Sequence, residues 1–299
     1  MTAVLGLGTY RVRAVAQAAR TALAAGAAWV DTAPNYADGF AQQQLAQVLG
    51  DFPDVRISTK TGFFTAAQGR AAVAAGVLPA DAAAGSHSLA PIFVRWQAER
   101  ALNVLGYADL VFVHNPERVD HDRVQVLFEL REAFAVLEEL AQSGQIGGYG
   151  VATWSGLTSG AFTVLELLGL AGEAAGSDAH HFTGLQLPVS LVMADPIDQA
   201  LGGGGPLVQA QDAGVITFAS APLHGGELPG LMTPELVEFI RPGLSAPAAA
   251  LLTVASCPGL DVVLVSASTP EHWDDAAKAV AVPLAPERLR SILDELAAG

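Results

Sequence analysis

Short apolar runs alternate with longer amphipathic stretches along the whole chain. The runs are brief and rich in β-branched and aromatic residues, which is typical of strands covered on both faces. The pattern predicts eight strands: Val4–Gly8, Trp29–Asp31, Val55–Thr59, Leu110–His114, Ile146–Val151, Gly184–Pro188, Val215–Ser220 and Val262–Ser266.

The stretches between these runs have a helical period. The predicted helices are Val15–Ala25, Phe40–Leu49, Pro91–Leu105, Arg123–Gln142, Ser159–Leu170, Pro206–Asp212, Ser245–Ser256 and Pro286–Ala298. Strands that alternate with helices in this number favour an α/β fold, a (β/α)8 TIM barrel, over an open doubly wound sheet. Because no Gly/Ser-rich linker or shift in composition divides the chain, we expect a single domain over residues 1–299.

Two stretches are longer than the usual connection between a strand and the helix that follows it. Residues 61–90 and 221–243 follow the third and seventh predicted strands, where connections of about 2–6 residues are usual. Barrel enzymes hold their active sites at the C-terminal ends of the strands, so we expect both stretches to lie as long loops over that face. The alternative is a disordered surface insertion. The run Gly202–Gly205 is expected to be a flexible loop, because no phosphate-binding pattern surrounds it.

Composition narrows the class of protein. The 299 residues are 51% hydrophobic and carry 15 Lys+Arg against 30 Asp+Glu, a net charge of −15, which argues against nucleic acid or an anionic membrane as partner. The single Cys257 excludes a disulfide framework, and we expect no metal site. No apolar run approaches the roughly 20 residues of a membrane span, and the N-terminus lacks a signal-peptide pattern. We therefore expect a cytoplasmic protein.

Polar residues close three consecutive predicted strands. Asp31, Lys60 and His114 stand at the ends of strands two, three and four, and Tyr36 follows Asp31 closely. Lys60 is one of only two lysines, the other being Lys278, so lysine is dispensable on most of this surface. Singly these residues could be a loop cap, a rim lysine and a core histidine. Together they favour a site at the mouth of the barrel.

These four side chains suit acid/base chemistry. A phenol has an ordinary pKa near 10, and a neighbouring ammonium group lowers it by favouring the phenolate. A carboxylate can hold that ammonium in place, and a histidine can orient a carbonyl oxygen or relay a proton. The set contains no strong nucleophile. We therefore expect Asp31, Tyr36, Lys60 and His114 to act on a carbonyl or an alcohol.

An ordered set of motifs resembles the aldo-keto reductases over nearly the whole chain: GLGTY, DTAPNYADG, STKTG, DLVFVHNPE, SGQIGGYGVATW, GLQLPVS, APLHGG and SASTPEH. The stretch HSLAP…ERALNVLGYADLVFVHNPE is similar to the galactose-dehydrogenase-like and threo-aldose-dehydrogenase-like branch. The resemblance implies a barrel that binds NADP(H) or NAD(H) without a Rossmann motif. In that scheme Tyr36 is the general acid/base, Lys60 and Asp31 tune it, His114 lies beside the substrate carbonyl, and the nicotinamide supplies the hydride.

The resemblance also implies a set of cofactor-binding residues: Gly8, Thr9, Tyr10, Asp31, Thr153, Gln186, Ser220, Leu223, Ser266, Ser268 and His272. Gln186 matches the family's partner for the carboxamide, whereas Ala152 and Thr153 stand in place of the usual Ser-Asn. Ser220 stands where an aromatic residue often stacks under the nicotinamide. The stretch Ser266–His272 contains no Lys or Arg for an adenosine 2′-phosphate, which weakens the preference for NADPH and admits NADH.

The leading hypothesis is thus an NAD(P)(H)-dependent oxidoreductase that interconverts an aldehyde or ketone with an alcohol or sugar hemiacetal. One alternative is a non-redox isomerase, dehydratase or cyclase with a degraded cofactor site, and another is a non-catalytic binding subunit. We expect a neutral or apolar small-molecule substrate and a monomer or weak homo-oligomer. The residues expected to line the substrate mouth are Phe63, His87, Trp154 and His224.

Overall fold

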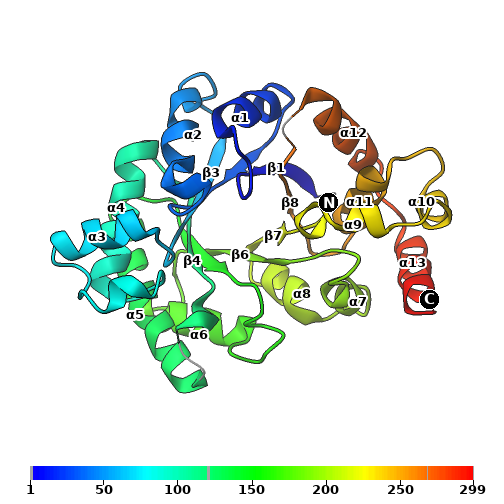
Figure 1. Cartoon of the computed structure of the whole chain (residues 1–299). Helices are drawn as coiled ribbons and strands as arrows, with labels where there is room; N and C mark the ends of the chain where they lie inside the picture. The colour runs from blue at the N-terminus through cyan, green and yellow to red at the C-terminus, as the bar shows by residue number, and fades with distance from the viewer. Residues whose placement is uncertain (1–2, 120–121, 268, 299) are drawn as a thin grey trace.

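Eight parallel strands close a barrel in chain order, with β8 paired to β1 (Figure 1). The structure, a computed structural model, describes residues 3–119, 122–267 and 269–298. The strands are β1 (Val4–Gly8), β2 (Trp29–Asp31), β3 (Arg56–Thr61), β4 (Leu110–His114), β5 (Tyr149–Ala152), β6 (Phe182–Pro188), β7 (Ile216–Ser220) and β8 (Val262–Val265). The predicted single-domain (β/α)8 barrel is confirmed.

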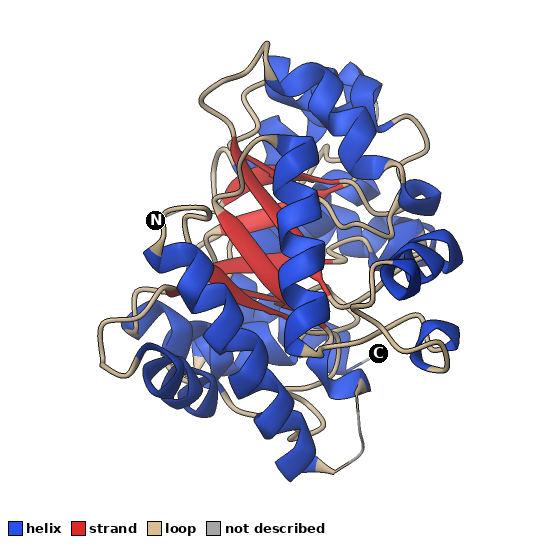
Figure 2. Cartoon of the chain, turned by 90° about the vertical axis from the view of Figure 1, so that its left-hand side faces the viewer, coloured by secondary structure: helices blue, strands red, loops and turns tan. Residues whose placement is uncertain are grey.

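Helices surround the barrel on all sides (Figures 1 and 2). They are α1 (Val15–Ala24), α2 (Ala41–Leu49), α3 (Ala66–Ala74), α4 (Pro91–Leu105), α5 (Arg123–Gln142), α6 (Val164–Ala175), α7 (Asp195–Leu201), α8 (Gly205–Asp212), α9 (Leu228–Leu231), α10 (Pro234–Ile240), α11 (Ala246–Ala255), α12 (Pro270–Val280) and α13 (Pro286–Ala298). Short 3₁₀ turns are η1 (Ala37–Gly39), η2 (Ala82–Ala84), η3 (Pro116–Arg118) and η4 (His224–Gly226). Within the described residues, no helix is long and apolar enough to cross a membrane.

The predicted element boundaries needed three main corrections. Helix α6 begins later than predicted, because Thr163 and Glu166 form a capping box there. Strand β3 runs on to Thr61, so Lys60 lies within the strand and is held by its ladder. Helix α12 was not among the predicted helices, although its buried Trp273 and Ala276 have helical spacing.

An aromatic cluster fills the barrel below the predicted site. The rings of Trp29 and Phe112 both lie edge-on to Phe218, with centroid distances of 5.0 Å and 5.5 Å. Gly184 makes room for this cluster, because a Cβ atom there would lie 2.8 Å from the Phe112 ring. The cluster occupies the interior with apolar side chains, so polar side chains on the same inner face must lie further along the strands.

The next inward positions on these strands are polar. Asp31, His114 and Ser220 each follow an aromatic member of the cluster by two residues, and alternate residues of a strand share a face. The aromatic cluster therefore separates this polar layer from the N-terminal end of the barrel. The layer faces the C-terminal end, where the predicted active site belongs.

The stretch at residues 61–90 is folded and is not a plain loop. It contains α3, which begins at a capping box between Thr65 and Gln68. Phe64 and Leu78 pack with Phe93 of α4 in a small apolar cluster of their own. The predicted long loop was wrong here, because the cap and this cluster stabilise a helix whose alanine-rich sequence shows little periodicity.

The stretch at residues 221–243 is also folded, into η4, α9 and α10. Leu228 and Ile240 pack in one apolar cluster with Ala249 of α11, which anchors the segment to the outer layer of helices. The backbone enters the segment under strain, because Ala221 and His224 have φ angles of 50° and 49°.

Candidate active site

A buried ion pair joins β2 to β3. The Lys60 Nζ donates to Asp31 Oδ2 at 2.5 Å and to the carbonyl oxygen of Thr32 at 3.0 Å. Lys60 is fully buried, and Asp31 is 3% exposed. Burial lowers the pKa of Lys60 because the ammonium loses its hydration, while the carboxylate of Asp31 opposes that shift by charge and hydrogen bonding. The predicted pairing of these two residues is therefore present.

The second carboxylate oxygen of Asp31 is also occupied. Its Oδ1 accepts hydrogen bonds from Ser58 Oγ at 2.8 Å and from Gln186 Nε2 at 3.0 Å. A buried charge is tolerated only when its hydrogen-bonding capacity is met, and here three side chains from two other strands meet it. Gln186, predicted as a carboxamide partner, thus has one amide proton committed to Asp31.

Tyr36 lies on the connection after β2, beside the ion pair. The centre of its ring is 5.1 Å from Lys60 Nζ and 5.2 Å from the ring of Tyr10. Burial raises the pKa of Tyr36 well above its ordinary value, and the charges of Asp31 and Tyr10 add to the shift. The predicted lowering by Lys60 is therefore outweighed, and the phenol is neutral at neutral pH.

His114 completes the set at the end of β4. Its ring stands nearly perpendicular to the Tyr36 ring, with centroids 6.1 Å apart. Burial lowers the pKa of His114 well below its ordinary value, and the positive charges of Lys60 and His87 lower it further. The imidazole is therefore neutral, and its buried Nδ1 has no hydrogen-bond partner in the described part of the chain. The four side chains predicted for catalysis meet in one place.

Phe63 and His87 form a wall beside His114. The Phe63 ring lies 4.8 Å from the His114 ring and 4.6 Å from the His87 ring. His87 Nε2 lies within hydrogen-bond distance, 2.8 Å, of the main-chain oxygen of His114. Gly62 has a φ of +124°, and a Cβ there would lie 2.9 Å from His87 Nε2, so glycine is needed for this contact. Two of the residues predicted to line the mouth thus adjoin the reacting groups.

Glu117 organises the loop after β5 and was missed in the sequence. Its Oε2 accepts from Thr153 Oγ1 at 3.0 Å, and its Oε1 accepts from the amides of Trp154 and Ser155 at 2.9 Å each. Thr153 Oγ1 also accepts from the amide of Gly156 at 2.8 Å, so this hydroxyl holds the loop. Only the closeness of Glu117 to His114 in the chain could have pointed to it. Trp154, predicted for the substrate mouth, is 47% exposed.

The predicted cofactor residues near β1 hold the end of that strand. Thr9 is buried, and its Oγ1 donates to the carbonyl of Asp31 at 3.0 Å. Ser266 Oγ donates to the carbonyls of Gly8 and Tyr10, at 2.8 Å and 3.1 Å. These hydroxyls therefore position the loop that carries Tyr10, whose exposed ring borders Tyr36.

The other predicted cofactor residues lie on the β7 and β8 sides. Ser220 ends β7, and Leu223 is half-buried directly before η4. His272 is exposed in the first turn of α12, and its amide donates to Thr269 Oγ1 at 3.3 Å. Ser268 lies outside the described residues.

The mouth of the barrel fits a polar ligand such as a nicotinamide dinucleotide. Asn35 Oδ1, His114 Nδ1 and His224 Nδ1 are buried and find no partner among the residues that the structure describes. An unpaired buried polar atom is costly, so a ligand that supplies the missing hydrogen bonds is stabilised there. The start of α12, capped by Thr269, adds main-chain amides suited to an anion.

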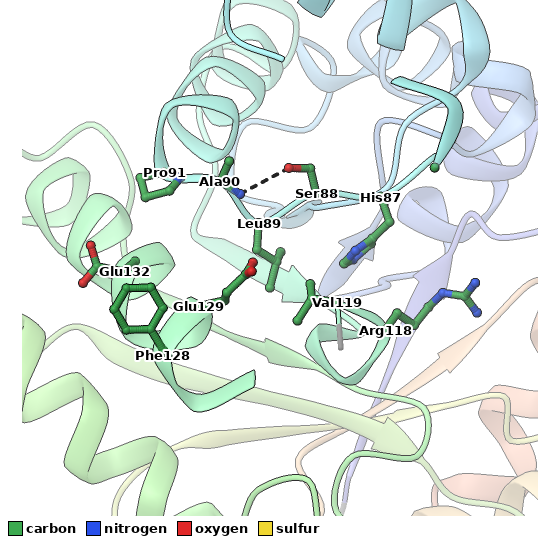
Figure 3. A pocket seen from close by; sticks show the side chains of 11 residues that line it. His87, Ser88, Leu89, Ala90, Pro91, Arg118, Val119, Phe128, Glu129 and Glu132 are labelled. Carbon is green, nitrogen blue, oxygen red and sulfur yellow. Dashed lines mark hydrogen bonds between the residues drawn. The ribbon is translucent and has the colours of Figure 1, made fainter. Parts of the chain in front are cut away.

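A cavity of about 470 Å³ lies between the end of the stretch at residues 61–90 and the elements η3 and α5 (Figure 3). It is lined by Gly85, His87, Ser88, Leu89, Ala90, Pro91, Arg118, Val119, Phe128, Glu129 and Glu132. None of the four predicted catalytic residues lines it, but His87 of its lining lies within hydrogen-bond distance of the main-chain oxygen of His114. Over the described ranges, no group of three or more His, Cys, Asp or Glu could hold a metal ion.

Comparison with known proteins assigns the class. The aldo/keto reductase family model matches residues 4–159, and the chain belongs to this family of oxidoreductases, which act on C=O and CH–OH groups. No curated protein matched the chain.

Solved structures support the fold. An aldo/keto reductase from Klebsiella pneumoniae in complex with NADP and acetate is 21% identical, with a TM-score of 0.68 over 98% of this chain and 90% of that one. The glycerol dehydrogenase from Gluconobacter oxydans is 18% identical, with a TM-score of 0.71 over 98% and 91% of the two chains. The holo form of an aldo-keto reductase from Bacillus halodurans is 19% identical, with a TM-score of 0.66 over 99% and 92%.

Proposed function

We propose that this protein uses NADP(H) or NAD(H) to interconvert a carbonyl compound with an alcohol or sugar hemiacetal, with Tyr36 as the general acid/base. The observation that carries the proposal is the grouping of Tyr36 with the Asp31–Lys60 ion pair on one side and neutral His114 on the other. The sugar hemiacetal follows from the motifs similar to the galactose-dehydrogenase-like and threo-aldose-dehydrogenase-like branch.

In the direction of reduction, the Tyr36 hydroxyl donates its proton to the carbonyl oxygen of the substrate. The raised pKa of Tyr36 keeps that proton in place at neutral pH until the oxygen becomes more basic in the transition state. Lys60, held by Asp31, then stabilises the phenolate that remains. When bound, the nicotinamide supplies the hydride to the carbonyl carbon, or accepts it from the alcohol.

His114 orients the carbonyl oxygen in this proposal. A neutral imidazole carries one N–H group, and a hydrogen bond from it polarises the carbonyl without consuming the proton of Tyr36. His87 supports this role, because its contact with the main-chain oxygen of His114 fixes the end of β4. His87 is thus a positioning residue.

The cofactor proposal includes both dinucleotides. It is supported by the unpaired buried atoms at the mouth, and by family relatives whose structures contain NADP or NADPH. The stretch Ser266–His272 offers no Lys or Arg to an adenosine 2′-phosphate, so we keep NAD(H) as the alternative. The cytoplasmic location and the monomeric or weakly associated state stay predictions.

The test combines binding with turnover. We expect NADPH or NADH to bind at micromolar concentration, measured by the change in tryptophan fluorescence, and Tyr36→Phe to lower kcat/KM for an aldehyde about 100-fold to 10,000-fold with the cofactor Kd unchanged. Tyr107→Phe is the matched control, because that hydroxyl donates to the Val55 carbonyl away from the site. Full turnover by Tyr36→Phe would remove the acid/base assignment. If neither cofactor binds at millimolar concentration, the non-redox alternative takes its place.

A further inference from the structure

Arg118 carries a positive charge beside the site without an acidic partner. Its guanidinium carbon lies 5.5 Å from the centre of the Phe63 ring. Within the described ranges it forms no ion pair, which is also true of Arg100, whereas Arg95 and Arg290 are paired with carboxylates. In a chain with 30 acidic and 15 basic residues, a cation left unpaired next to the reacting groups is available to a ligand.

The contacts connect this charge to the reacting groups through one ring. The centre of the Phe63 ring lies 4.8 Å from the His114 ring and 5.5 Å from the guanidinium carbon of Arg118. The guanidinium therefore lies no farther from His114 than the sum of these distances, within the span of a small molecule. Figure 3 shows the Arg118 side chain directed away from Phe128 and Glu129.

The backbone that carries Arg118 is well held. η3 starts after Asn115, which adopts the left-handed conformation with a φ of 47° and donates its amide to the Ala152 carbonyl at 2.6 Å. Pro116, the first residue of η3, is buried. The guanidinium is thus presented from a fixed turn and not from a free loop.

Acidic residues lie near Arg118, but within the described ranges none forms an ion pair with it: Glu117 is its chain neighbour, and Glu129 and Glu132 line the same cavity. The carboxylate of Glu117 is taken by Thr153 and by the amides of Trp154 and Ser155. His87 is the other titratable group on this wall, and burial lowers its pKa, with the charge of Arg118 adding to that shift. A neutral histidine offers no negative charge to a guanidinium.

We propose that Arg118 binds a carboxylate of the substrate, so that the preferred substrates are aldehydes or ketones that also carry a carboxylate group. The carbonyl lies between Tyr36 and His114, the Phe63 ring covers the apolar middle of the molecule, and the guanidinium pairs with the carboxylate. In reduction the carbonyl carbon receives the hydride and its oxygen receives the proton, while the carboxylate is unchanged. This inference rests on the proposed function and names its substrate class.

Two matched substrates test it: 4-formylbenzoate and its methyl ester, in which a methyl group replaces the charge. We expect kcat/KM to favour 4-formylbenzoate, and Arg118→Gln to lower the ratio of the two values about tenfold to 100-fold, with the change mainly in KM. Arg118→Lys should recover part of the ratio. The control is Arg100→Gln, which removes another exposed arginine over an aromatic ring, 4.8 Å from the centre of Trp96 on α4.

The outcomes separate this inference from the proposed function. An unchanged ratio in Arg118→Gln overturns the carboxylate assignment and leaves the oxidoreductase intact. If the wild type reduces neither aldehyde with either cofactor, the proposed function is what fails. Calorimetric titration with 4-formylbenzoate then decides the assignment by binding alone. Weaker binding to Arg118→Gln than to wild type supports it, and equal binding overturns it.

Discussion

The inner wall of the barrel and the rim above it differ in how their polar atoms are satisfied. On the wall, formed by β2, β3 and β6, the Asp31 carboxylate accepts from Ser58, Lys60 and Gln186. On the rim, His114 and His224 each bury a ring nitrogen with no partner in the described part of the chain. The Asp31 carboxylate is fully paired by the protein alone, although among the described residues Trp29 Nε1 and Thr61 Oγ1 on the same strands are not, whereas the two rim histidines lack hydrogen bonds that a ligand could supply.

The two regions also handle charge differently. The wall holds a carboxylate and an ammonium that neutralise each other, while His87 and His114 at the rim are neutral because burial lowers the pKa of both. A preorganised wall costs no rearrangement when the reaction occurs, and the two neutral histidines add no charge of their own to the rim, where Arg118 is a nearby cation. The substitutions and the pH change below perturb each region separately.

The largest effect should come from opening the wall. Asp31→Ala leaves Lys60 buried without its counter-charge, so we expect the free energy of unfolding to fall by about 3–5 kcal/mol, measured by urea denaturation. Asp51→Ala removes an exposed ion pair with Arg20 and should cost far less. Equal losses in the two variants would show that the wall does not depend on this pair.

The second-largest effect should be a loss of folding stability at acidic pH, caused by the two rim histidines His87 and His114. The unfolded chain binds protons at His87 and His114 with an ordinary pKa near 6.5, whereas in the folded protein both pKa values are lowered. Stability is therefore present above pH 6.5 and is lost as the pH falls below it, by up to about 1.4 kcal/mol per pH unit for each histidine. His114→Gln should flatten this slope in urea titrations, and His272→Gln, at an exposed site, should not. The same slope in all three proteins would contradict the assignment.

The smallest effect should be at the loop after β5. Glu117→Gln weakens three hydrogen bonds to a carboxylate, so we expect a loss of about 1–2 kcal/mol of stability and faster hydrogen exchange at the amides of Trp154 and Ser155. Glu132→Gln, which changes a residue paired with Arg131 on α5, is the control. Unchanged exchange at both amides would mean that the loop keeps its conformation without Glu117.

The barrel and the four grouped residues could be predicted because their signals are local. A strand buried on both faces is a short apolar run, and a polar residue that ends it is visible in the same few positions, as with Asp31 and His114. Helix α3 could not be predicted in this way, because alanines occupy both of its faces. Helix α12 was not among the predicted helices, although its buried Trp273 and Ala276 have helical spacing.

Other features depend on distances between segments that no pattern encodes. The sequence predicted a lowered pKa for Tyr36 from the nearby lysine, but burial sets the sign of the shift. The expectation of a neutral or apolar substrate stays a prediction, which the comparison of 4-formylbenzoate with its methyl ester tests. The position of Arg118 over Phe63 depends on the turn at Asn115 and on the fold of residues 61–90, neither of which the chain order reveals.

The hydrogen bond from Gln186 to Asp31 spans 155 positions of the chain. All four grouped residues have been synthesised once the ribosome has passed His114. The Asp31 carboxylate still lacks one hydrogen-bond donor at that point, because Gln186 lies on β6. A nascent chain, or a fragment that ends between β4 and β6, would thus contain Asp31, Tyr36, Lys60 and His114 but lack the hydrogen bond from Gln186 to Asp31. We therefore expect the Asp31 carboxylate to gain its full set of donors only once β6 has joined the barrel.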